Sequence, residues 1–142
     1  PDSNFAIRLY GDYEKKTDIQ EVTGIFFAGY RNKILNIGAE ASLKTNLDAI
    51  SGHNAWGLSA TGGVNITEKD EVFIRYDYST SVVPEGETQQ WNHSLDGTFA
   101  IVGIQHSFTP NIRLALDFQG RNPYEEGQAN SNLLFLNALF RF

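Results

Sequence analysis

The sequence predicts an all-β chain of eight antiparallel strands that run up and down and close into a barrel. Three observations predict this fold. Apolar and polar residues alternate with a period of two over eight segments. The composition is that of a β-rich chain, with 13 Gly, 10 Phe and 6 Tyr but only 4 Pro. The 142 residues end on an apolar segment rather than on a polar tail. We expect a single domain over residues 1–142.

The first half of the chain contains four expected strands, at residues 5–13, 22–30, 34–44 and 55–66. Three of them place large apolar residues in one register and small or polar residues in the other. The second strand does not, because its apolar residues occupy both registers. Its faces therefore stay unassigned, with Phe26, Ala28 and Tyr30 competing with Ile25, Phe27 and Gly29.

The second half contains strands at residues 72–79, 97–108 and 112–119, followed by a last strand that begins at Asn132 and ends at Phe142. The last strand is the most apolar of the eight. One of its faces carries Leu134, Leu136, Ala138, Phe140 and Phe142. Its length of about eleven residues matches one tilted crossing of a bilayer by a β-strand.

The links between the expected strands alternate in length. Long polar links occupy residues 14–21, 45–54, 80–96 and 120–131. Short turns centre on Asn32, Lys69 and Pro110. Short turns on one side and long loops on the other are typical of barrels in the outer membrane.

The alternation does not say which face meets water, but the residues on the two faces do. The polar face is rich in Gly, Ser, Asn and Thr, and it carries few of the lysines that a soluble surface would have. No apolar run approaches the length of a transmembrane helix. We therefore predict a transmembrane β-barrel, with a soluble lipocalin-like barrel as the alternative. The expected membrane-interface aromatic residues are Tyr13, Tyr30, Trp56, Tyr76, Tyr78, Phe108, Phe118, Phe140 and Phe142.

Three stretches carry a resemblance to known proteins: FIRYDYST at 73–80, GIQHSFTPNIRLALDF at 103–118 and FLNALFRF at 135–142. They resemble the strand–turn–strand endings of porin-like outer-membrane β-barrel proteins, including the terminal phenylalanine. The strand count is similar to that of the small barrels of the OmpA and OmpX type. A chain that is the C-terminal part of a larger porin would look the same. One departure is that Phe73, Phe99, Ile101, Phe135 and Leu139 fall on the polar face.

Charged residues on the polar face are the candidate functional groups. In an eight-stranded barrel they would form a salt-bridged network that fills the narrow lumen. In a wider pore they would form a charged constriction that selects ions. These residues are Arg8, Asp12, Glu40, Lys44, Arg75, Asp77, Arg113, Asp117 and Arg141.

Other chemistry receives little support from the sequence. There is no Cys, and His53, His93 and His106 lack metal-ligand spacing, so we expect no metal and no cofactor. The net charge of −6 argues against nucleic acid as a partner. His93 and Ser94 suggest a lipid-modifying enzyme as a third hypothesis, but neighbours in one loop rarely form a catalytic pair.

The sequence thus predicts a non-enzymatic, porin-like protein of a Gram-negative outer membrane that passes small solutes or ions if its lumen is open. The alternative is a structural or adhesion barrel with a filled lumen, which acts through its extracellular loops. The expected partners are the lipid bilayer, lipopolysaccharide near the acidic loops, and the barrel-assembly machinery through the last strand. A larger membrane complex is a further candidate partner.

Overall fold

The computed structural model describes residues 4–16 and 18–141. Eight strands and one short 3₁₀ helix, η1 (Leu47–Ala49), make up the regular structure of this part of the chain. The strands are β1 (Phe5–Lys16), β2 (Ile19–Arg31), β3 (Leu35–Thr45), β4 (Ala55–Asn65), β5 (Asp70–Ser81), β6 (Gly97–Thr109), β7 (Ile112–Pro123) and β8 (Ser131–Phe140). The chain is therefore all-β, as the sequence predicts.

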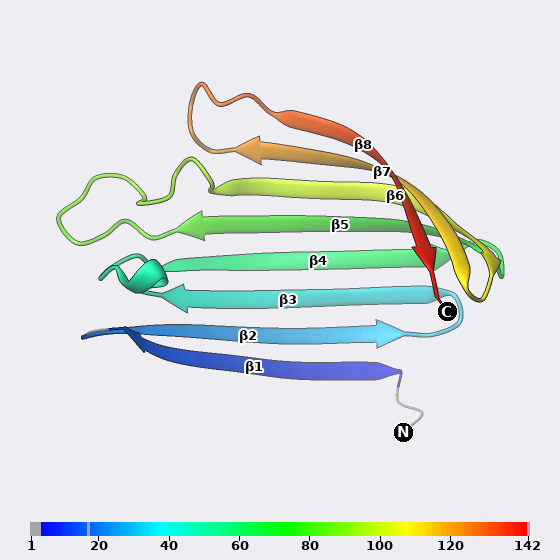
Figure 1. The fold of residues 1–142 in the computed structure, drawn as a ribbon, viewed down its shortest axis with the longest axis horizontal. Coiled ribbons are helices and arrows are strands. Elements are labelled where there is room, and N and C mark those ends of the chain that lie inside the picture. Colours follow the sequence, from blue (N-terminus) through cyan, green and yellow to red (C-terminus); the bar gives the residue numbers. More distant parts are fainter. Residues whose placement is uncertain (1–3, 17, 142) are drawn as a thin grey trace.

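The strands form one antiparallel sheet in strict sequence order, from β1 to β8. Figure 1 shows this curved sheet with the turns 32–34, 66–69 and 110–111 at one end. The longer links 46–54, 82–96 and 124–130 lie at the opposite end. We call these the turn end and the loop end. Side chains at the turn end therefore come from residues far apart in the sequence.

The link between the first two strands corrects one expectation. A long polar link was expected over residues 14–21, but β1 continues to Lys16 and β2 begins at Ile19. Paired backbones extend through this charged stretch, with Lys16 opposite Ile19 and Glu14 opposite Glu21. The Lys16 and Glu14 side chains form an ion pair of 3.1 Å. This extension of the two strands was not predicted, because both faces become polar here and the apolar alternation ends while the backbone pairing continues.

The sheet is open between β1 and β8. In the described part of the chain, β1 pairs only with β2, and β8 pairs only with β7. All residues of both strands are exposed. The closed barrel expected from the sequence is therefore not what this sheet forms by itself, since one row of backbone groups on each edge strand has no ladder partner.

No apolar side chain among the described residues is fully buried, so the sheet has no conventional core. A chain of this length normally folds in water around such a core. Within residues 4–16 and 18–141, no helix is long and apolar enough to cross a membrane.

Candidate functional site

The two faces of the sheet differ in both residue type and exposure. The polar face carries Glu40, Arg75, Asp77 and Asp117, and the apolar face carries side chains such as Ile74. Along β3, β4 and β6 the polar-face residues are mostly half-buried and the apolar-face residues are exposed. Ile74 itself is 57% exposed. This distribution is the reverse of that in a soluble barrel, whose apolar side chains point inward.

Strand β2 places its aromatic residues on both faces. Phe26 and Tyr30 share the apolar face with Ile37, and Phe27 lies on the polar face opposite Arg8 and Glu40. The Arg8 guanidinium carbon lies 5.7 Å from the centre of the Phe27 ring, a cation–π contact. The sequence could not assign this strand, because Ile25 and Phe27 mimic an apolar register on the polar face.

An ion pair between Arg75 and Asp77 is the centre of the predicted charge cluster. Arg75 Nε lies 2.9 Å and 2.8 Å from the two carboxylate oxygens of Asp77. Together with Glu40, these residues line a shallow hollow of about 240 Å³ on the polar face. Two carboxylates and one guanidinium in a half-exposed hollow can bind or repel a small charged solute.

Asp117 is the most buried predicted charge, at 4% exposed. Its two carboxylate oxygens accept hydrogen bonds from Gln119 Nε2 at 2.8 Å and from Asn137 Nδ2 at 2.6 Å. Neither amide was among the predicted functional residues. Gln119 lies two positions from Asp117 on the same face of β7, so the period of two could have shown it, whereas the contact of Asn137 depends on the β7–β8 register. An alternation of polar residues within one strand does not reveal that register.

The nine predicted charges do not form one network in the described part of the chain. Arg75 and Asp77 are the only ion pair among them, and Arg8 lies over an aromatic ring. Asp12 and Lys44 lie near the loop end, opposite Thr23 in the paired strands. Arg113 and Arg141 lie at the turn end and line a hollow there.

Glycines make room for large rings on the polar face. A Cβ on Gly103 would lie 2.5 Å from Phe73 Cζ and 2.7 Å from Asp117 Cβ. A Cβ on Gly38 would likewise lie 2.9 Å from the ring of Phe27. Phe73, Phe99 and Ile101 are half-buried on this face, whereas Phe135 and Leu139 on β8 are exposed, so only part of the departure noted in the sequence corresponds to packed side chains.

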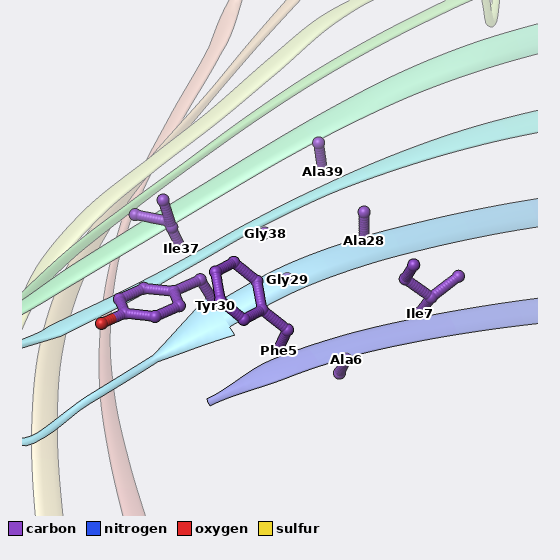
Figure 2. Close-up of a pocket in the computed structure, with 9 residues that line it drawn as sticks. All are labelled: Phe5, Ala6, Ile7, Ala28, Gly29, Tyr30, Ile37, Gly38 and Ala39. Atoms are coloured by element: carbon purple, nitrogen blue, oxygen red, sulfur yellow. The ribbon is translucent and has the colours of Figure 1, made fainter. Parts of the chain in front are cut away.

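The apolar face has a shallow hollow of about 470 Å³ where small residues meet (Figure 2). Figure 2 shows Ala28 and Ala39 at its floor beside Gly29 and Gly38. Phe5 and Tyr30 stand at one side, with ring centroids 4.8 Å apart. This surface contains almost no polar atoms, so it suits an apolar solvent.

The described residues among the predicted interface aromatics lie on the apolar face, at different positions between the turn end and the loop end. Trp56, Tyr78 and Tyr124 form a chain of rings at the loop end, with centroids 5.2 Å and 5.9 Å apart. Phe108 packs against His106 at the turn end. Tyr76 and Phe118 lie nearer the middle of their strands, and Phe142 lies outside the described residues. Tyr13 and Phe140 are exposed near opposite ends of the sheet.

The loop end is held together by specific hydrogen bonds. Asp96, 3% exposed, accepts hydrogen bonds from the Ser81 backbone N–H at 2.7 Å and the Ser81 hydroxyl at 2.5 Å. The Trp91 indole N–H donates to the Asn54 carbonyl at 2.8 Å, and its ring stacks on His53. Arg121 donates to the carbonyl of Ser94 at 3.3 Å. Link 82–96 is therefore fixed against link 46–54. The role of Arg121 was missed because strand seven was expected to end at residue 119.

Tyr124 lies in the link between β7 and β8. Partial burial raises the pKa of its phenol, and a hydrogen bond with Tyr78 acts in the same direction. The neutral phenol is therefore the favoured form in the folded state.

His93 and Ser94 are the residues considered for catalysis. His93 Nδ1 is buried and has no hydrogen-bond partner in the described part of the chain, so this nitrogen does not contact the Ser94 hydroxyl. No group of three or more His, Asp or Glu among the described residues could hold a metal ion.

In comparisons with known proteins, no family model, no curated protein and no solved structure matches this chain.

Proposed function

We propose that this chain forms the wall of a transmembrane β-barrel in a Gram-negative outer membrane and that it is porin-like, passing small solutes along its polar face. The observation that carries the proposal is the exposed apolar face opposite a polar face that is mostly half-buried along β3, β4 and β6. In water, the fold would forgo roughly 25 cal/mol of stabilising free energy for each Å² of apolar surface left unburied. In a bilayer, the same face meets hydrocarbon.

The dimensions of the strands support a bilayer crossing. The strands contain 10 to 13 residues, and a tilted crossing needs about 9–11. Hydrocarbon cannot satisfy free backbone groups, so the edges of β1 and β8 must be paired in the membrane. The proposal therefore includes closure of the sheet through these two edges.

Passage of solutes is supported by the polar face. It is lined by hydroxyls, amides and the Arg75–Asp77 pair. The filled-lumen alternative is favoured by one observation, the half-buried rings of Phe27 and Phe73 over Gly38 and Gly103. A barrel of eight strands has little room beyond such side chains.

Single-channel conductance of the refolded chain in a planar bilayer separates these functions. The porin-like function predicts discrete, salt-dependent steps, and Asp77→Asn should shift the reversal potential toward anion selectivity. A folded, inserted chain that stays silent would exclude passage and leave the filled barrel.

Insertion is tested separately with the two tryptophans. In vesicles containing brominated lipid, Trp56 on the apolar face should be quenched, as measured in the Trp91→Phe variant. Trp91 lies in link 82–96 and provides the matched control in Trp56→Phe. Equal quenching of both tryptophans would contradict a specific orientation, and no quenching of Trp56 would contradict insertion.

A further inference from the structure

The polar face opens at the turn end into a hollow of about 690 Å³, which we call the basic hollow. Its walls come from the turns 32–34 and 66–69 and from the ends of β2, β5, β6 and β7. The five positively charged side chains that line it are Arg31, Lys33, Lys69, Arg113 and Arg141. Three acidic residues, Glu68, Asp70 and Glu71, share this lining.

Among these basic side chains, Lys69 interacts electrostatically with Asp70, the residue that follows it. None of the five forms an ion pair or a side-chain hydrogen bond within the described part of the chain. Two of the three carboxylates are already engaged. Asp70 accepts from the Thr67 hydroxyl at 2.5 Å and contacts His106 Nδ1 at 2.7 Å, and Glu71 accepts from Gln105. Five basic and three acidic side chains leave an excess of positive charge here, although the whole chain has a net charge of −6.

Arg113 shows most directly what this hollow lacks. Its Nε is buried and has no hydrogen-bond acceptor in the described part of the chain. A buried donor without an acceptor is costly, and a guanidinium is satisfied best by an oxyanion that accepts two parallel hydrogen bonds. The neighbouring amides and hydroxyls of Gln105 and Ser107 add polar partners to the same wall.

The hollow at the opposite end of the sheet has the opposite sign. The hollow beside links 46–54 and 82–96 contains Glu85 and Glu87 and no Lys or Arg. Positive charge at the turn end is therefore a local feature. A polar surface at the turn end could be built from uncharged residues, so polarity alone does not explain the basic residues there.

We propose that the basic hollow binds small solutes carrying two or more phosphate or carboxylate groups. The inference rests on the proposed function, because it takes the polar face as the solute path, and it names the solute class held at one mouth. The guanidinium of Arg113 and the charges of Arg31, Lys33 and Arg141 would share one multivalent anion.

Calorimetric titration of the refolded 142-residue chain in a neutral detergent, with inorganic pyrophosphate as the probe, tests this site. We expect saturable binding that weakens as salt is raised. Arg113→Gln and Arg141→Gln should each weaken binding by about tenfold, as loss of one charge-assisted contact implies. Lys15→Gln removes the same charge at the loop end and should leave binding unchanged.

Absence of saturable binding by the unmodified chain would overturn the inference. So would an equal loss in Lys15→Gln, because it would show a response to net charge alone. If Arg113→Gln fails to fold, the exposed Arg141 provides the decisive variant. The titration needs no conductance, so a silent barrel that binds pyrophosphate contradicts passage only, and a conducting barrel that does not bind contradicts this site only.

Discussion

The polar and apolar faces of the sheet tolerate different kinds of substitution because each is adapted to a different neighbour. On the apolar face, residues such as Leu58 and Ile74 are exposed and contact little else in the protein. On the polar face, Asp117 and Gly103 are in contact with specific side chains across the sheet. The apolar face therefore depends on the surrounding solvent, whereas the polar face depends on internal geometry.

Charge placement gives the largest expected contrast. Ile74→Lys puts a cation on the apolar face and should cost about 2–4 kcal/mol of stability in a bilayer. Ser59→Lys puts the same cation on the polar face, between Glu40 and Asp77 in the strand register, and should be tolerated. Vesicle insertion yield and urea unfolding of the inserted protein measure both variants. Equal costs would remove the distinction between the faces.

Volume gives the next contrast. Gly103→Ala should destabilise the fold by about 1–3 kcal/mol, because the added methyl would overlap Phe73 and Asp117. On the apolar face, a Cβ on Gly62 would meet only Ile74, at 3.5 Å, so Gly62→Ala should have a much smaller effect. Equilibrium unfolding of both variants provides the test. A larger loss for Gly62→Ala would show that the polar face is not the packed one.

Hydrogen bonding gives a smaller effect. Asn137→Ala removes a donor to the buried Asp117 carboxylate and should cost about 1 kcal/mol. Asn132→Ala is the matched control, since Asn132 lies on the apolar face of the same strand and its side chain donates no hydrogen bond to the described residues. Thermal unfolding of the two variants measures the difference, and indistinguishable midpoints would argue against the Asp117 contact.

Tyrosine titration gives the smallest effect. Burial raises the pKa of Tyr124, so the stability it contributes is present below the ordinary tyrosine pKa and is lost as pH rises through the raised value. Absorbance titration should show one late-ionising phenol that disappears in Tyr124→Phe. Tyr78→Phe should move that phenol toward the ordinary value. The same titration curve for the unmodified chain, Tyr124→Phe and Tyr78→Phe would contradict the burial of the Tyr124 phenol.

The strands were predictable where apolar residues alternate, and they were missed where alternation ends. The turns near Asn32, Lys69 and Pro110 were recognised because loop-forming residues interrupt clear strands. The β1–β2 hairpin was not recognised, since Glu14, Lys15 and Lys16 pair through the backbone without an apolar face. Propensity for a strand reflects packing of side chains, which this extension does not need.

The candidate site was predictable only within single strands. Arg75 and Asp77 lie two positions apart, so their shared face follows from the period alone. The contacts of Asp117 with Asn137, and the gathering of Arg31 and Arg113 at one mouth, depend on register and turn geometry across strands. The alternation of residues along one strand does not reveal these contacts between strands. For the same reason it did not show that the edges of β1 and β8 are open.

The strict sequence order of the strands also bears on how the chain assembles. Each strand pairs with its immediate neighbours in the sequence, so every hairpin closes through one of the links between residues 17 and 130. The strands contact their neighbours in the sequence, and the entropy of closing each link grows only slowly with its length. Hairpins can therefore form one after another from either end. In the proposed closed barrel, pairing of the β1 and β8 edges would unite the two ends of the sheet, and we expect that contact to form last and to set the folding rate.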